Sequence, residues 1–154
     1  MPFAIDKIYR EARGKTVLLG MPDTLIEPDQ AFEILLARFD EHRADLELGL
    51  FRTEPDCYGG FIQTDPLSSR VISHIDKTAP RFPRTTANNS WAIACWNDRF
   101  TEFLHRFIEN KREDYRYRGF GQFPELLFGD VIDAAIADKQ GVGAQLVIAN
   151  IPLD

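Results

Sequence analysis

Residues 17–24 read VLLGMPDT, an apolar run that ends in a glycine, a proline and an aspartate. A short apolar run bounded by turn residues predicts a buried strand around residues 16–19 that stops at Gly20. Ligands of open α/β sheets bind outside the carboxyl ends of the strands, which makes Asp23 a candidate site residue on a rim loop. The alternative is that Asp23 initiates an ordinary turn beside Pro22, and the local pattern alone favours that alternative.

Helices and strands alternate on both sides of this stretch. Apolar residues at helical spacing predict a helix over 5–12 and a stronger helix that begins at Pro28. Strict alternation in DLELGLF, residues 45–51, predicts a strand with its three leucines on one side. The other predicted elements are strands at 60–64 and 70–75 joined as a hairpin, a loop at 78–89, a strand at 90–96, a helix begun by Asn97 or Asp98, a helix with inward residues from Leu127 to Ile136, and a final strand at 144–151.

This order of elements predicts one α/β domain over residues 1–154. The chain is long enough for a single core, with 44% hydrophobic residues. Strands that alternate with helices pack as layers, so we expect a Rossmann-like mixed sheet, partly parallel, with helices on both faces.

Composition and charge narrow the classes of partner. Twenty-four acidic residues against 18 basic ones give a net charge of -6, which works against binding to nucleic acid or to an anionic membrane. No run approaches the roughly 20 apolar residues of a membrane span, and the charged N-terminus does not read as a signal peptide. Cys57 and Cys95 have neither metal-ligand nor disulfide-framework spacing, so we expect reduced thiols in a cytoplasmic protein.

A second candidate carboxylate is Asp130, in the segment PELLFGDVI at residues 124–132. Two carboxylates from separate rim elements, Asp23 and Asp130, could hold Mg²⁺, which prefers oxygen ligands and keeps several waters and phosphate oxygens. The alternative for Asp130 is a position near a helix start, where a carboxylate complements the positive end of the helix dipole.

Two further segments could bind a phosphorylated ligand. Asp76-Lys77 closes a predicted strand and could present a cation to a phosphate, although a solvated strand end is the commoner fate of such a pair. Gly59-Gly60 opens a strand and would allow a ligand to approach the backbone closely, although most such pairs only shape a turn.

The remaining polar and aromatic residues favour no particular chemistry. His42, His74 and His105 have no cysteine or histidine at ligand spacing, which argues against metal or catalytic-triad roles for them. Residues 118–123, RGFGQF, are similar to the aromatic motif of RNA recognition domains, but Gln122 and the acidic net charge argue against RNA binding.

Several of these segments, taken in order, resemble the sugar-phosphate nucleotidylyltransferases, the family that includes glucose-1-phosphate thymidylyltransferase. The stretch VLLGMPDT followed by LIEPDQAFEILL is similar to a family strand that ends in an aspartate, with the next helix behind it. The segments that follow in the family's order are ELGLFRTEP, YGGFIQTD, SRVISHIDKT, SWAIACWNDRFTEFL and PELLFGDVIDAAI. The shared order, more than any single match, carries the resemblance.

The resemblance implies a function for the candidate residues. It makes Asp23 and Asp130 the carboxylates of a Mg²⁺ site, Lys77 the contact to the sugar phosphate, and Asp76 and Gly59 neighbours of the sugar. In that family, a sugar-1-phosphate oxygen attacks the α-phosphorus of a nucleoside triphosphate and pyrophosphate leaves. Such chemistry depends on positioning and on neutralisation of the developing charge, and a carboxylate-held Mg²⁺ can serve both needs.

The sequence also departs from the family. Thr78 stands where the family usually has proline, and the strand and basic glycine-rich loop that hold the nucleotide are not found in these 154 residues. We therefore expect an incomplete nucleotide-diphospho-sugar transferase-like domain with little activity alone, and an uncovered sheet edge that favours a homo-oligomer or a complementing N-terminal segment. The alternative is a non-catalytic module that binds sugar phosphate or another protein and retains the fold.

Overall fold

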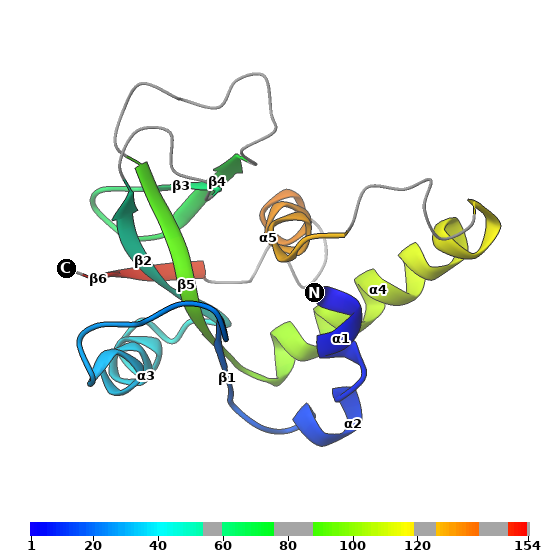
Figure 1. Ribbon diagram of the computed structural model, residues 1–154, viewed down its shortest axis with the longest axis horizontal. Helices are drawn as coiled ribbons and strands as arrows, with labels where there is room; N and C mark the ends of the chain where they lie inside the picture. The colour runs from blue at the N-terminus through cyan, green and yellow to red at the C-terminus, as the bar shows by residue number, and fades with distance from the viewer. Residues whose placement is uncertain (54–59, 76–87, 119–125, 139–147, 154) are drawn as a thin grey trace.

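The computed structural model describes residues 1–53, 60–75, 88–118, 126–138 and 148–153 (Figure 1). Its larger sheet has four strands in the order β1-β5-β2-β6, namely β1 (Val17–Gly20), β5 (Asn88–Trp96), β2 (Leu46–Thr53) and β6 (Ile148–Leu153). Strand β5 runs antiparallel to both β1 and β2, whereas β2 and β6 are parallel. The sheet is therefore mixed and partly parallel, as the sequence predicts.

A separate two-stranded sheet is the predicted hairpin. Its strands, β3 (Phe61–Thr64) and β4 (Val71–Ile75), pair antiparallel. The Asp65 carboxylate accepts the backbone N–H groups of Leu67 and Ser68 at 2.8 and 2.9 Å, which closes the turn and lowers the pKa of this carboxyl group. The turn residues that predicted the hairpin therefore stabilise it directly.

Helices cover both faces of the larger sheet (Figure 1). One face lies under α3 (Ala31–His42), where Leu35 and Phe39 pack against Ile93 and Cys95 of β5. The other face carries the main core, in which α4 (Asp98–Arg118) and α5 (Phe128–Ala137) pack on the sheet. This core includes the three leucines of β2 as predicted, Leu46, Leu48 and Leu50, all at most 1% exposed.

The first helix and the first strand differ from the prediction. Two short helices, α1 (Pro2–Asp6) and α2 (Tyr9–Ala12), replace the continuous helix, because the N–H groups of Lys7 and Ile8 bond three residues back. Strand β1 pairs only with β5 among the described strands, and Leu18 is 44% exposed. The prediction that this strand is buried is wrong, because a short apolar run does not distinguish an edge strand from a central one.

The start of α5 also differs from the prediction. Leu127 was expected to face inward, but it precedes the helix in an extended conformation and is partly exposed. The inward face begins one residue later and comprises Phe128, Val131, Ile132 and Ala135. No helix within the described ranges has the length and the apolar character that crossing a membrane demands.

Asn97 begins α4, as predicted. Its Oδ1 accepts the backbone N–H groups of Arg99 and Phe100 at 2.9 and 3.3 Å, and its Nδ2 donates to the buried Asp45 carboxylate at 2.8 Å. We expect Asn97→Ala to lower the free energy of unfolding by about 1–2 kcal/mol, because the helix cap is lost and Asp45 loses a donor. Chemical denaturation measures the change. Asn97→Ser, which keeps a capping oxygen, should lose less, and equal losses for the two variants would contradict the capping role.

Candidate active site

The rim beyond β1 carries the first candidate carboxylate. Strand β1 ends at Gly20, and Asp23 follows in an exposed turn whose Thr24 N–H bonds to the Met21 carbonyl at 3.4 Å. Asp23 Oδ1 accepts the Thr24 hydroxyl at 3.4 Å. Since β1, β2 and β6 point in the same direction, their carboxyl ends lie toward the same edge of the sheet. The turn is present as the alternative predicted, and metal binding by Asp23 stays a prediction.

Asp130 lies in the first turn of α5 and is exposed. Its Oδ2 accepts the backbone N–H of Leu127 at 2.7 Å, so the carboxylate caps the start of its own helix. The carboxylate therefore stabilises the start of the helix, which is the alternative to metal binding that the sequence analysis gave for Asp130. With one oxygen used in the cap, Asp130 would offer Mg²⁺ its other oxygen, and this role also stays a prediction.

The three remaining predicted site residues, Gly59, Asp76 and Lys77, lie outside the described residues. Gly60, which follows Gly59, and His74, which precedes Asp76 by two positions, are both described.

His74 is buried where the hairpin meets α5. Its imidazole Nδ1 lies 3.1 Å from Oδ2 of Asp133, which is half exposed on α5. A Cβ atom at Gly60 would lie 2.7 Å from His74 Nε2, and one at Gly129 would overlap the same ring. Both glycines are therefore needed for the close approach of the imidazole. At Gly60, the group that approaches the backbone closely is therefore the imidazole of His74.

This junction joins three segments that carry predicted site residues. Gly60 is next to Gly59 in the sequence, His74 lies just before Asp76 and Lys77, and Gly129 is next to Asp130. The chemistry available at the junction is a buried imidazole held by a carboxylate, which fixes the orientation of the ring. Sequence reasoning missed this role of His74 because its partner, Asp133, is 59 positions away in the chain.

The other two histidines also contact carboxylates, a kind of partner that the absence of cysteine or histidine at ligand spacing does not exclude. His42 Nδ1 lies 3.1 Å from Oε2 of Glu47, and His105 Nδ1 lies 2.7 Å from Oδ1 of Asp6. Burial raises the pKa of Glu47 to about 7, although His42 opposes the shift. His42 and Glu47 are only five residues apart, so of the three pairs only this one could have been predicted from neighbouring residues in the sequence.

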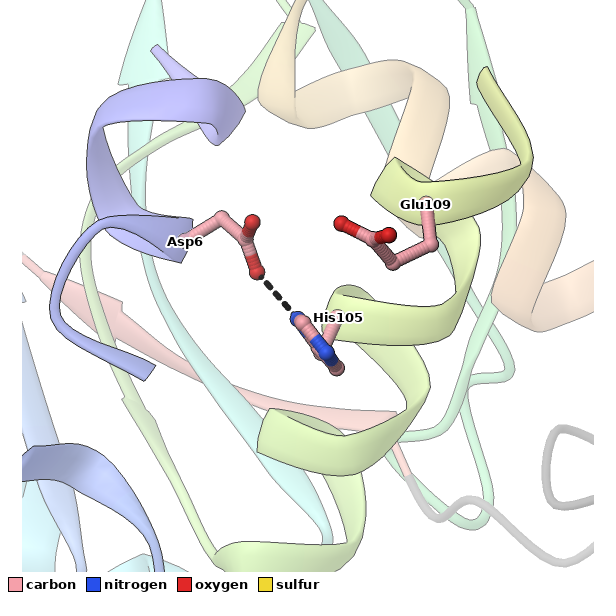
Figure 2. A group of neighbouring side chains, drawn as sticks. All are labelled: Asp6, His105 and Glu109. Carbon is pink, nitrogen blue, oxygen red and sulfur yellow. Dashed lines mark hydrogen bonds and ion pairs between the residues drawn. The ribbon is translucent and has the colours of Figure 1, made fainter. Parts of the chain in front are cut away.

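One group of metal-binding side chains comes together in the described part of the chain, formed by Asp6, His105 and Glu109 (Figure 2). Neither Asp23 nor Asp130 belongs to this group. Cys95 is a free, buried thiol whose pKa is raised by burial to about 12, which keeps it protonated and unreactive at neutral pH.

Comparison with known proteins identifies the type of fold. No family model matches the chain, and no curated protein sequence matches it either. Among solved structures, one similar protein is assigned as a glucose-1-phosphate thymidylyltransferase from Bacillus anthracis, in complex with sucrose, with a TM-score of 0.65 and 11% identity over 100% of this chain. Another is HddC from Yersinia pseudotuberculosis, with a TM-score of 0.56 and 12% identity over 99% of this chain.

The fold is thus nucleotidyltransferase-like, of the nucleotide-diphospho-sugar transferase type. The structural similarity shows the fold, whereas identities of 11% and 12% leave the activity to be argued from the residues themselves. The chain spans about half the length of both solved proteins, 52% in each case.

Proposed function

We propose that this domain supplies the sugar-phosphate side of a sugar-phosphate nucleotidyltransferase site. The single observation that supports this most is the fold, because a protein assigned as a glucose-1-phosphate thymidylyltransferase has a similar structure, with a TM-score of 0.65. In this proposal Lys77 contacts the phosphate of a sugar-1-phosphate, and Asp76 and Gly59 lie near the sugar.

The described residues support this assignment through the His74 junction. At this junction Gly60, His74 and Gly129 lie close together. Gly60 follows Gly59 in the sequence, His74 is in the strand that precedes Lys77, and Gly129 precedes Asp130. A ligand that carries both a phosphate and several hydroxyl groups needs a cation and polar groups from more than one segment. Segments that meet at a buried, well-packed point can hold such groups in a fixed geometry.

Mg²⁺ is the proposed cofactor, held by Asp23 and Asp130. Both side chains are exposed carboxylates, the hard oxygen donors that Mg²⁺ prefers. When bound, the ion would neutralise phosphate charge as the nucleotidyl group is transferred and pyrophosphate leaves. The cap made by Asp130 fixes its carboxylate at the start of α5, so that one oxygen is held in a defined position.

The nucleotide side of the site is proposed to come from a glycine-rich segment with basic residues. Such a loop before a helix binds phosphates through backbone N–H groups and the helix dipole, and the 154 residues contain none in that context. We therefore expect sugar-phosphate binding by this chain and little release of pyrophosphate. Its partner would be a complementing N-terminal segment, which would dock near β1, the strand at the edge of the sheet among the described strands.

Sugar-phosphate binding is the direct test. We expect the chain, titrated calorimetrically with a panel of sugar-1-phosphates in Mg²⁺, to bind at least one of them. Lys77→Ala should weaken that binding by at least about tenfold, because a charge-assisted hydrogen bond contributes about 1.5–3 kcal/mol. Lys7→Ala removes an exposed lysine of α1–α2 as the matched control and should leave the affinity unchanged.

The outcomes separate the two candidate functions. Binding without turnover, followed by pyrophosphate release after the glycine-rich segment is added, supports a split enzyme. Tight binding that never yields turnover supports the non-catalytic module. No binding of any sugar phosphate, or equal binding by Lys77→Ala, contradicts the proposal.

A further inference from the structure

A cluster of metal-ligating side chains lies between α1 and α4, on elements that the proposed sugar-phosphate site does not use. His105 and Glu109 are four residues apart on α4 and therefore share one face of the helix. Asp6 comes from α1, and its carboxylate is 1% exposed. Figure 2 shows the carboxylates of Asp6 and Glu109 turned toward each other, with the imidazole of His105 beside them.

The distances suit a common ion. One ligand atom from each side chain lies within 4.8 Å of the other two, and His105 Nδ1 is 2.7 Å from Asp6 Oδ1. Zn²⁺ binds imidazole nitrogen and carboxylate oxygen at about 2.0–2.2 Å, so tetrahedral ligand atoms are about 3.4 Å apart. Moderate side-chain shifts, chiefly of the half-exposed Glu109, would bring the three atoms to that separation.

The surroundings hold the imidazole and the buried carboxylate in place. The ring of Tyr9 stacks on His105 with centroids 3.7 Å apart and an angle of 9°, and the Tyr9 hydroxyl donates to Glu102 at 2.8 Å. On another side, Asp6 borders a small hollow lined mainly by apolar side chains such as Ile5 and Leu104. Supporting contacts around ligand side chains of this kind orient them and raise metal affinity.

We propose that Asp6, His105 and Glu109 form a binding site for a divalent transition-metal ion that fastens α1 to α4. The donor set determines the class of ion. An imidazole nitrogen with two carboxylate oxygens suits Zn²⁺ and similar ions, whereas Mg²⁺ prefers oxygen ligands alone. The site therefore differs in chemistry from the Mg²⁺ site proposed at Asp23 and Asp130, and it does not depend on that proposal.

Arg112 is the competitor for this site. Its guanidinium lies 2.7 Å from Asp6 Oδ2 and 3.2 Å from Glu109 Oε1, so it neutralises both carboxylates when no ion is bound. An ion on Asp6 Oδ1 leaves the Arg112 bond to Oδ2 intact, but the positive charge of the guanidinium repels a cation bound beside it. Arg112 therefore lowers the affinity of the cluster for cations, and its removal should raise that affinity.

The test is calorimetric titration of the tag-free chain with Zn²⁺. We expect one site whose association constant falls at least about tenfold in both His105→Asn and Glu109→Gln, and rises in Arg112→Gln. A tenfold excess of Mg²⁺ should not displace Zn²⁺. The ring signals of His105 in an NMR spectrum should shift on Zn²⁺ addition, which reports binding at this residue directly.

Two matched controls separate a metal site from an ion-pair network. His42→Asn removes a histidine with the same kind of carboxylate partner, and Glu41→Gln removes an exposed glutamate that pairs with an arginine three residues away, as Glu109 does. Neither control should change Zn²⁺ affinity. Wild-type affinity in His105→Asn and Glu109→Gln would overturn the proposal, as would the absence of binding in both the wild type and Arg112→Gln.

Discussion

Gly129→Ala is expected to lower the free energy of unfolding by about 2 kcal/mol or more, although alanine is the better helix former. The added Cβ would overlap the imidazole of His74, which is 7% exposed and held between the hairpin and α5. Overpacking a buried position costs about 1–3 kcal/mol. Helix propensity alone favours alanine over glycine by about 0.5–1 kcal/mol, so the two effects have opposite signs.

The His74 ring itself provides the control. In a His74→Ala background the space beside residue 129 is open, and Gly129→Ala should then be close to neutral or stabilising. The four proteins of this double-mutant cycle, unfolded by heat and by urea, should give a coupling free energy of about 2 kcal/mol. For a domain of this size, the single variant should melt about 4–8 °C below the wild type. If Gly129→Ala costs the same in both backgrounds, the close approach does not explain the glycine.

Most of the layered fold could be predicted because its signals are local. The alternating leucines of β2 predicted a strand with all three leucines on one side, and all three are buried. Asn97 predicted the start of α4 through the capping preference of its side chain, and the cap is present. Periodicity and capping depend only on nearby residues, so these predictions needed no knowledge of the tertiary structure.

The errors come from packing between distant segments. Whether the VLLG strand is central or at an edge depends on which strands lie beside it, and the sequence does not contain that information. Likewise, His74 and His105 bind carboxylates 59 and 99 positions away. The position of Asp23 just beyond a strand end followed from the turn residues after the strand and is confirmed, whereas its metal role needs ligands that only tertiary structure can bring together.

Glu47 should make the domain less stable as the pH rises through neutrality. Its carboxyl group is fully buried on β2 under α3, and burial raises its pKa from 4.5 to about 7. His42 and Arg38 favour the ionised form, while the negative charge of Glu41 opposes it. Because the folded protein keeps this proton at a pH where the unfolded chain releases it, the stabilisation is full below pH 4.5 and is lost as the pH rises to about 7.

Glu47→Gln isolates this contribution, since glutamine has the same shape and no charge. We expect the free energy of unfolding of the variant, relative to the wild type, to rise by about 3 kcal/mol between pH 4.5 and pH 8, at 1.36 kcal/mol for each unit of pKa shift. Urea unfolding at several pH values measures the difference. Glu33→Gln makes the same charge change on an exposed side chain of α3 and should give a nearly flat difference. A flat difference for Glu47→Gln as well would mean that the buried carboxyl group ionises in the folded protein as readily as in the unfolded chain, with the His42 pair offsetting its burial.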